Sequence, residues 1–286
     1  MAKRSIFLYL AIAVAIVWSI FPIYWFCRMA FLTPNEIRLF PQPFVPHVFE
    51  LGTLYNIFGY DYEYAAGFVS GASGQSNQII RGVFNGLFMS GIVTVITLFI
   101  VVPLAYVFAR MEFRHKEKLL FAVLLAVALP PVSTLIPFYS MYVQLGLNGT
   151  RFGLIVVTLT ITVPFVAWML IGYFRNLPPI ERLARIDGYS RTSCLLTLIL
   201  PLAKSGIAVA AVIAFLFSWN EYTYALVLVN GTSANTLPTA ISGFLGQYPE
   251  PGNLAASVIV TIIPPALFAY FLQRHVTEMS LVDPVR

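Results

Sequence analysis

Charged residues are scarce in this sequence. Only 10% of its 286 residues are Asp, Glu, Lys or Arg, whereas 59% are hydrophobic. A typical soluble domain carries roughly 25% charged residues. A fold in water could not bury so much apolar surface, but helices in a bilayer expose apolar side chains to lipid and satisfy their own backbone hydrogen bonds. The composition therefore predicts an all-α integral membrane protein.

Cysteine and histidine are also few. Cys27 and Cys194 are isolated, and His47, His115 and His275 belong to separate predicted loops. These spacings predict neither a disulfide framework nor a metal site. The sequence lacks a Gly-rich phosphate loop ending in Lys-Ser/Thr, and it offers no cluster of polar catalytic residues. We therefore expect no cofactor bound to this chain and no enzyme activity.

Long apolar runs dominate what is present. Six of them are long enough to cross roughly 30 Å of hydrocarbon, which takes about 20 residues. They cover 6–27, 84–109, 119–142, 152–174, 206–229 and 255–273. The first run is too long for a signal peptide and lacks a small-residue cleavage pattern, so we expect it to stay as a helix. The sequence predicts one transmembrane domain over 1–286 with six helices, the third kinked at Pro130 and Pro131.

Lys and Arg indicate the orientation. With the N-terminus inside, 13 of the 17 basic residues fall on the cytoplasmic side, as positively charged loops do. They are Lys3, Arg4, Arg110, Arg114, Lys116, Lys118, Arg175, Arg182, Arg185, Arg191, Lys204, Arg274 and Arg286. Both termini are therefore predicted to be cytoplasmic. Because these residues lie in short loops rather than on one soluble face, the net charge of +5 indicates topology and no nucleic-acid partner.

Two predicted loops are long enough for a function of their own. Loop 29–83 is extracytoplasmic and rich in Pro, Gly and aromatic residues, and loop 175–205 is cytoplasmic. In the second loop, Pro178 and Pro179 suit the first turn of a helix, and Gly188 suits its end. Ser190 is a plausible N-cap for a second short helix. Such a pair would either dock into a partner's groove or lie on the lipid surface.

The second loop carries a recognisable pattern. Asp187-Gly188 is followed thirteen residues later by Pro201, within Ile-Leu-Pro-Leu. This resembles the coupling-loop signature of binding-protein-dependent ABC importer permeases. Further matching segments are Asn85, the Leu-Ala-Tyr-Val-Phe-Ala-Arg run at 104–110, Pro137, Leu-Gly-Leu at 145–147 and Phe-Ser-Trp-Asn-Glu-Tyr at 217–222. Together they are similar to the carbohydrate-uptake branch, in particular the six-helix permease of the maltose type.

The resemblance implies a function and partners. It implies a type I ABC importer permease fold in a bacterial or archaeal inner membrane, forming half of the pathway for a carbohydrate or polyol. It also implies a second homologous permease, two ATPase subunits that hold ATP and Mg²⁺, and an extracytoplasmic solute-binding protein. A secondary transporter driven by an ion gradient is the alternative, with Glu221 as its ion or proton site.

The resemblance also assigns residues that contact the ATPase. They are Glu181, Arg182, Ala184, Asp187 and Gly188. The chain departs from the family where Glu-Ala-Ala usually precedes Asp-Gly, because Arg182, Leu183 and Ala184 stand there and Glu181 comes one residue early.

The candidate substrate pathway is Trp219, Asn220, Glu221 and Tyr222. Glu221 follows Lys204 by 17 residues, which places it deep in a helix or toward the outer face. An ionisable group at such depth usually faces a bundle interior or a water-filled path. Amide and carboxylate groups hydrogen-bond hydroxyls, and aromatic rings stack on sugars. The alternative is an aromatic belt at the outer boundary that fixes helix packing.

Overall fold

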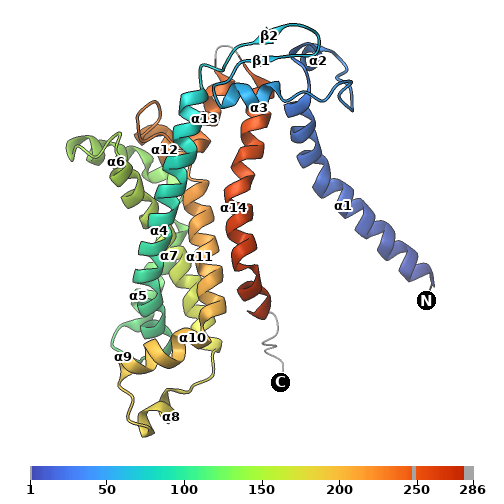
Figure 1. The fold of residues 1–286 in the computed structure, drawn as a ribbon. Coiled ribbons are helices and arrows are strands. Elements are labelled where there is room, and N and C mark those ends of the chain that lie inside the picture. The colour runs from blue at the N-terminus through green and yellow to red at the C-terminus, as the bar shows by residue number, and fades with distance from the viewer. Residues whose placement is uncertain (1, 247–248, 280–286) are drawn as a thin grey trace. The chain divides into compact units, whose positions relative to one another are not determined.

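The computed structural model describes residues 2–246 and 249–279, and the predicted cytoplasmic Arg286 lies outside this range. Most of these residues are helical, and the described part contains one small sheet, an antiparallel pair of two-residue strands. The fold class predicted from composition is confirmed (Figure 1). Contacts group the chain into two compact units, 1–83 with 237–263, and 84–236 with the chain from 264 onward.

The first unit contains one long helix, the short elements that follow it, and a later segment of the chain that includes the start of α14 (Pro251–Met279). Its elements are α1 (Ala2–Phe31), α2 (Pro34–Arg38), α3 (Gly52–Ile57), β1 (Tyr62–Glu63), β2 (Val69–Ser70), α13 (Leu237–Ser242) and a 3₁₀ turn (Gly243–Leu245). Strands β1 and β2 pair with Tyr62 opposite Ser70. A capping box starts α2, in which the Thr33 hydroxyl accepts from the Glu36 N–H and the Glu36 carboxylate accepts from the Thr33 N–H. Loop 29–83 is therefore a folded structure rather than a tether.

The second unit holds most of the helices. They are α5 (Lys116–Ala128), α6 (Pro131–Gln144), α7 (Arg151–Asn176), α8 (Glu181–Ile186), α9 (Arg191–Cys194), a π-helical turn (Leu195–Ile199), α10 (Leu200–Leu202), α11 (Lys204–Trp219) and α12 (Thr223–Leu228). Two long helices, α4 (Ser76–Arg110) and α14 (Pro251–Met279), begin in the first unit and continue into the second.

Five described helical segments are long and apolar enough to cross a membrane, and a sixth is obtained if α5 and α6 form one span. These two helices meet at 90°. The bend has a local cause, because Pro130 and Pro131 lack the N–H groups that would continue α5, and Pro131 starts α6 at its first position. The kink predicted at these prolines is therefore present.

Helix α7 is the centre of the second unit's core. It packs against α5 on one side and α11 on another, and its Leu170 and Phe174 are fully buried. Gly206 of α11 lies against Tyr173, where an added Cβ would be 2.3 Å from the ring. This close approach lets the two backbones pack tightly, as small residues do in membrane bundles.

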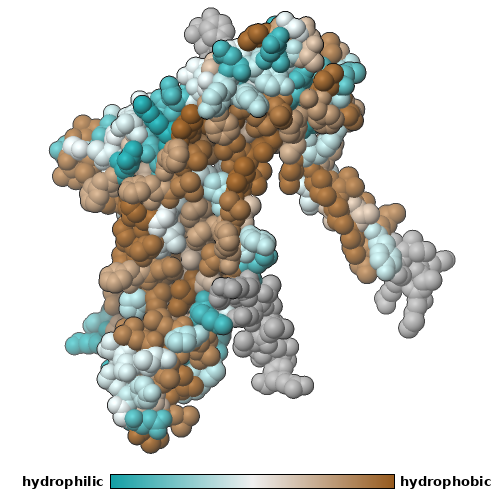
Figure 2. Space-filling view, viewed as in Figure 1, coloured by the Kyte–Doolittle hydropathy of each residue, from teal (hydrophilic) through white to brown (hydrophobic). Residues whose placement is uncertain are grey.

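Apolar side chains remain on the surface of the long helices. Figure 2 shows hydrophobic residues along α1, where Tyr9 is 68% and Trp18 is 81% exposed. In water such a surface would be costly, whereas lipid or another membrane helix covers it without loss.

Candidate translocation pocket and coupling loop

The membrane span formed by α11 and α12 is broken near its end. Helix α11 stops at Trp219 and α12 begins at Thr223, so Asn220 and Glu221 lie on a short non-helical link. The predicted span 206–229 corresponds to the candidate span Lys204–Leu228, which this link interrupts. Polar side chains at the break compete for the backbone groups that a continuous helix would use.

Asn220 and Glu221 each stabilise one side of the break. The Asn220 side-chain amide donates to the carbonyl of Leu216 at 3.0 Å, which closes the end of α11. A Glu221 carboxylate oxygen accepts from the Tyr224 N–H at 2.6 Å, which caps the start of α12. A helix N-terminus also favours a negative charge. Both residues therefore have a structural role in addition to any contact with solute.

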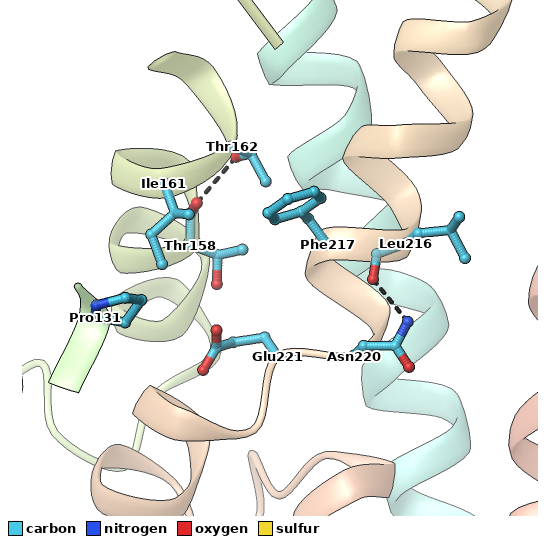
Figure 3. A pocket seen from close by; sticks show the side chains of 8 residues that line it. All are labelled: Pro131, Thr158, Ile161, Thr162, Leu216, Phe217, Asn220 and Glu221. Carbon is cyan, nitrogen blue, oxygen red and sulfur yellow. Dashed lines mark hydrogen bonds between the residues drawn. The ribbon is translucent and has the colours of Figure 1, made fainter. Parts of the chain in front are cut away.

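The break borders a pocket of about 410 Å³. It is lined by Pro131, Thr158, Ile161, Thr162, Leu216, Phe217, Asn220 and Glu221. Figure 3 shows the side chains of Thr158 and Glu221 facing the same space, with the Phe217 ring nearby. The threonine hydroxyls donate to carbonyls one turn back on α7, Thr158 to Leu154 and Thr162 to Thr158. The Thr158 oxygen keeps its lone pairs for a ligand, whereas the Thr162 oxygen also accepts from the Thr97 hydroxyl at 3.4 Å.

The other two predicted pathway residues lie elsewhere. Trp219 is 1% exposed, stacks on Phe215 with 6.0 Å between ring centroids, and lies against Gly86 of α4. Tyr222 is the N-cap residue of α12 and is outside the pocket lining. The sequence reasoning missed Thr158 and Thr162. Their spacing of four residues placed them on one face of α7, which was the available signal.

The predicted helix pair is present in loop 175–205, which we call the coupling loop. Gly188 ends α8 with φ +86°, a left-handed conformation that favours glycine, and its N–H donates to the Arg185 carbonyl at 3.1 Å. The Ser190 hydroxyl accepts from the Ser193 N–H at 3.1 Å and caps α9. Pro178 and Pro179 precede α8 instead of starting it, because a residue before proline is disfavoured in helical geometry.

The predicted ATPase-contact residues differ in exposure. Ala184 is buried against the helix bundle, whereas its neighbour Leu183 is 66% exposed. Asp187 is the exposed C-cap of α8. Glu181 forms an ion pair with Arg110 of α4, and Arg182 lines a polar cavity of about 490 Å³ beside that pair. In residues 2–246 and 249–279, no three His, Cys, Asp or Glu side chains gather closely enough to hold a metal ion.

Comparison with known proteins identifies the chain. The family model described as "Binding-protein-dependent transport system inner membrane component" matches residues 101–278. The chain belongs to this family. It is 35% identical over 210 residues to the trehalose transport system permease protein SugB of Mycobacterium tuberculosis, which covers 68% of this chain and 77% of SugB. It is 25% identical over 272 residues to the sulfoquinovosyl glycerol transport system permease protein SmoH of Agrobacterium fabrum, covering 94% and 90%.

A solved structure shows the same fold. A chain of a bacterial ABC transporter involved in the import of the acidic polysaccharide alginate superposes with a TM-score of 0.73 at 18% identity, covering 96% of this permease and 97% of that chain. The predicted importer permease fold is therefore confirmed. The permease is a multi-pass inner-membrane component of an ABC transporter. Its relatives are transport subunits rather than enzymes, and permeases of this family generally work with ATPase and solute-binding partners.

Proposed function

We propose that this permease is a subunit of an ATP-driven importer for a carbohydrate or polyol and that its pocket lines half of the solute pathway. The pocket supports this best, because Thr158, Thr162, Asn220 and Glu221 bring hydroxyl, amide and carboxylate groups into an otherwise apolar span. These groups accept and donate hydrogen bonds to solute hydroxyls, and the Phe217 ring offers an apolar face for a sugar ring. The name of the trehalose relative SugB supports the same solute class.

The coupling loop is the proposed contact with the ATPase. Glu181, Arg182, Ala184, Asp187 and Gly188 lie on or just after α8. The exposed side chains of Leu183 and Ile186 give that short helix an apolar surface, which suits docking into a partner's groove. In the proposed complex, two ATPase subunits hold ATP and Mg²⁺, a second homologous permease completes the pathway, and an extracytoplasmic protein delivers the solute.

Transport then follows an alternating-access cycle. ATP binding favours one arrangement of the two permeases, and hydrolysis with product release restores the other. The permease itself makes and breaks no covalent bond. We place both termini and the coupling loop in the cytoplasm, and loop 29–83 outside, because of the distribution of Lys and Arg.

The test is uptake by proteoliposomes that contain the permease with its genomic-neighbour permease, ATPase and binding protein. Labelled trehalose, maltose, glycerol and an amino acid are supplied outside, with ATP inside. We expect ATP-dependent uptake of a hydroxylated solute that persists when ionophores remove all ion gradients. Uptake that needs a gradient and proceeds without the ATPase would instead establish the secondary transporter, with Glu221 as its ion site.

A further inference from the structure

Arg110 and Glu181 join the end of one long helix, α4, to the start of α8 in the coupling loop. Arg110 is the last residue of α4, and Glu181 is the first residue of α8. The Nε atom of Arg110 lies 3.3 Å from Oε1 of Glu181. The two side chains are only 11% and 15% exposed. Because both side chains are largely buried, salt screens their attraction less than it would at an exposed surface, and the pair constrains the two helices.

The same guanidinium holds the chain that enters α8. Its Nη2 donates to the carbonyl of Leu177, which follows α7, and to the carbonyl of Pro178 at 3.3 Å. Arg110 therefore contacts the end of α4, the end of α7 and the start of α8 at once. Within the described part of the chain, neither Arg110 Nε nor Glu181 Oε1 has a hydrogen-bond partner, so the contact between these two atoms is an ion pair without hydrogen-bond geometry.

Other charges nearby are arranged differently. Glu112 also has a basic partner, Lys116 at 2.8 Å, but its side chain is 90% exposed, and exposed pairs of this kind contribute little. Asp187 lies on the solvent side of α8. The carboxylate available for a partner protein is thus that of Asp187, whereas that of Glu181 is already engaged inside the permease.

We propose that Arg110 and Glu181 form a latch that makes α8 move as one body with the ends of α4 and α7. Glu181 is then a positioning residue for coupling rather than a direct contact with the ATPase. This inference rests on the proposed coupling function. A displacement of α8 by the ATPase would be transmitted through the latch to α4 and α7, and α7 carries Thr158 and Thr162 of the pocket. Without the latch, α8 would move while the pocket stays still.

The experiment uses the assembled complex in proteoliposomes and measures three quantities: ATPase subunits bound per permease, the rate of ATP hydrolysis, and solute molecules transported per ATP. The variants are Glu181→Gln and, as a matched control from an exposed ion pair, Glu112→Gln. For Glu181→Gln we expect normal assembly and hydrolysis but transport per ATP lowered about tenfold or more, because a buried charge loses its partner. Glu112→Gln should match the wild type. Loss of the ATPase from the Glu181→Gln complex would overturn the latch and indicate a direct contact.

A cross-linked variant keeps the test decisive if the Glu181→Gln permease itself folds poorly and cannot be tested in the complex. Arg110→Cys and Glu181→Cys are combined with Cys27→Ala and Cys194→Ala, and a short reducible bis-thiosulfonate reagent bridges the two new thiols. Bridging should restore transport per ATP, and reduction should abolish it again. A bridged complex that stays uncoupled would overturn the latch. Failure of the wild-type complex to bind ATPase or to transport would instead refute the proposed function, so the two failures are distinguishable.

Discussion

The indole ring of Trp219 lies against Gly86 so closely that a Cβ added to Gly86 would be 2.9 Å from the nearest ring carbon. Trp219 is the last residue of α11, and Gly86 lies in α4. The contact packs the last turn of α11 against α4, directly before Asn220 and Glu221 of the pocket.

A side chain at Gly86 should displace this contact. We predict that Gly86→Ala destabilises the permease by about 1–3 kcal/mol, the usual cost of overpacking a tight site. The matched control is Gly91→Ala on the same helix, where nothing lies within 4 Å of an added Cβ. That change should be neutral or slightly stabilising because alanine favours helices. Thermal unfolding in mild detergent measures both, and equal midpoints would contradict the packing described here.

Thr158 should contribute to solute binding. Its side chain is buried and lines the pocket, whereas Thr160 on the same helix is exposed and lies outside the lining. We predict that Thr158→Val raises the half-saturating solute concentration roughly threefold to tenfold, which is the loss of one hydrogen bond. Thr160→Val should leave it unchanged. Both values come from uptake measured at a series of solute concentrations with a fixed amount of complex. Equal effects of the two changes would exclude this pocket from the pathway.

Glu36 should make the first unit sensitive to acid. Its partial burial alone would raise its pKa, but hydrogen bonds from His47 and Thr33 outweigh burial and lower the pKa from 4.5 to about 2. A carboxyl whose pKa is lower in the folded state stabilises that state fully above pH 4.5. This stabilisation is lost as the pH falls toward about 2.

Hydrogen exchange of residues 33–47, corrected for intrinsic rates, tests this. Glu36→Gln should weaken protection at pH 7, and its difference from the wild type should shrink progressively at lower pH. Glu63→Gln is the control, because Glu63 is exposed. A Glu36→Gln difference that stays constant down to pH 2.5 would refute the assignment.

Cys194 should resist thiol reagents despite its place in a short loop. It is 3% exposed, and burial raises the pKa of its thiol above 9.0, with Glu181 adding to the increase. Because the thiolate is the reactive form, we predict that N-ethylmaleimide at pH 7 labels it at least about tenfold more slowly than an exposed cysteine. The reference variant is Arg191→Cys with Cys194→Ala, and Cys27→Ala is present in both proteins. Similar labelling rates would mean that α9 does not pack as described.

Sequence patterns predicted the membrane helices and the kink at Pro130 and Pro131, but they missed the start of α4 and the break at Asn220. Apolar runs located the membrane helices because a helix that crosses lipid must be long and hydrophobic. Glycine and serine located the C-terminus of α8 and the N-terminus of α9 because helix caps depend on neighbouring residues in the sequence. The start of α4 at Ser76, rather than near 84, was missed because its first turns are polar. The break at Asn220 was missed because the mean hydropathy of the run 206–229 is high even though it contains the polar residues Asn220 and Glu221.

The Arg110–Glu181 pair shows a second kind of feature that the sequence does not predict. Each residue belongs to a motif that was recognised, but the two lie in different segments, and their meeting depends on how α4, α7 and α8 pack. Likewise, in the sequence Thr158 and Thr162 are ordinary helix residues. Only the structure shows that they line the same pocket as Glu221. Tertiary packing decides which of these residues meet, and local sequence patterns do not predict that packing.

The most direct test of the account is the effect of Gly188→Asp on co-purification of the ATPase and on its hydrolysis rate. The matched control is Gly231→Asp, because Gly231 also has a positive φ, +71° against +86°, and open space around it, but lies outside the coupling loop. An aspartate at either position bears a similar backbone strain of roughly 1–2 kcal/mol. We predict that Gly188→Asp loses the bound ATPase or its stimulated hydrolysis while Gly231→Asp keeps both. Normal coupling in Gly188→Asp, or equal loss in the two variants, would contradict the central claim that this loop couples the permease to ATP hydrolysis.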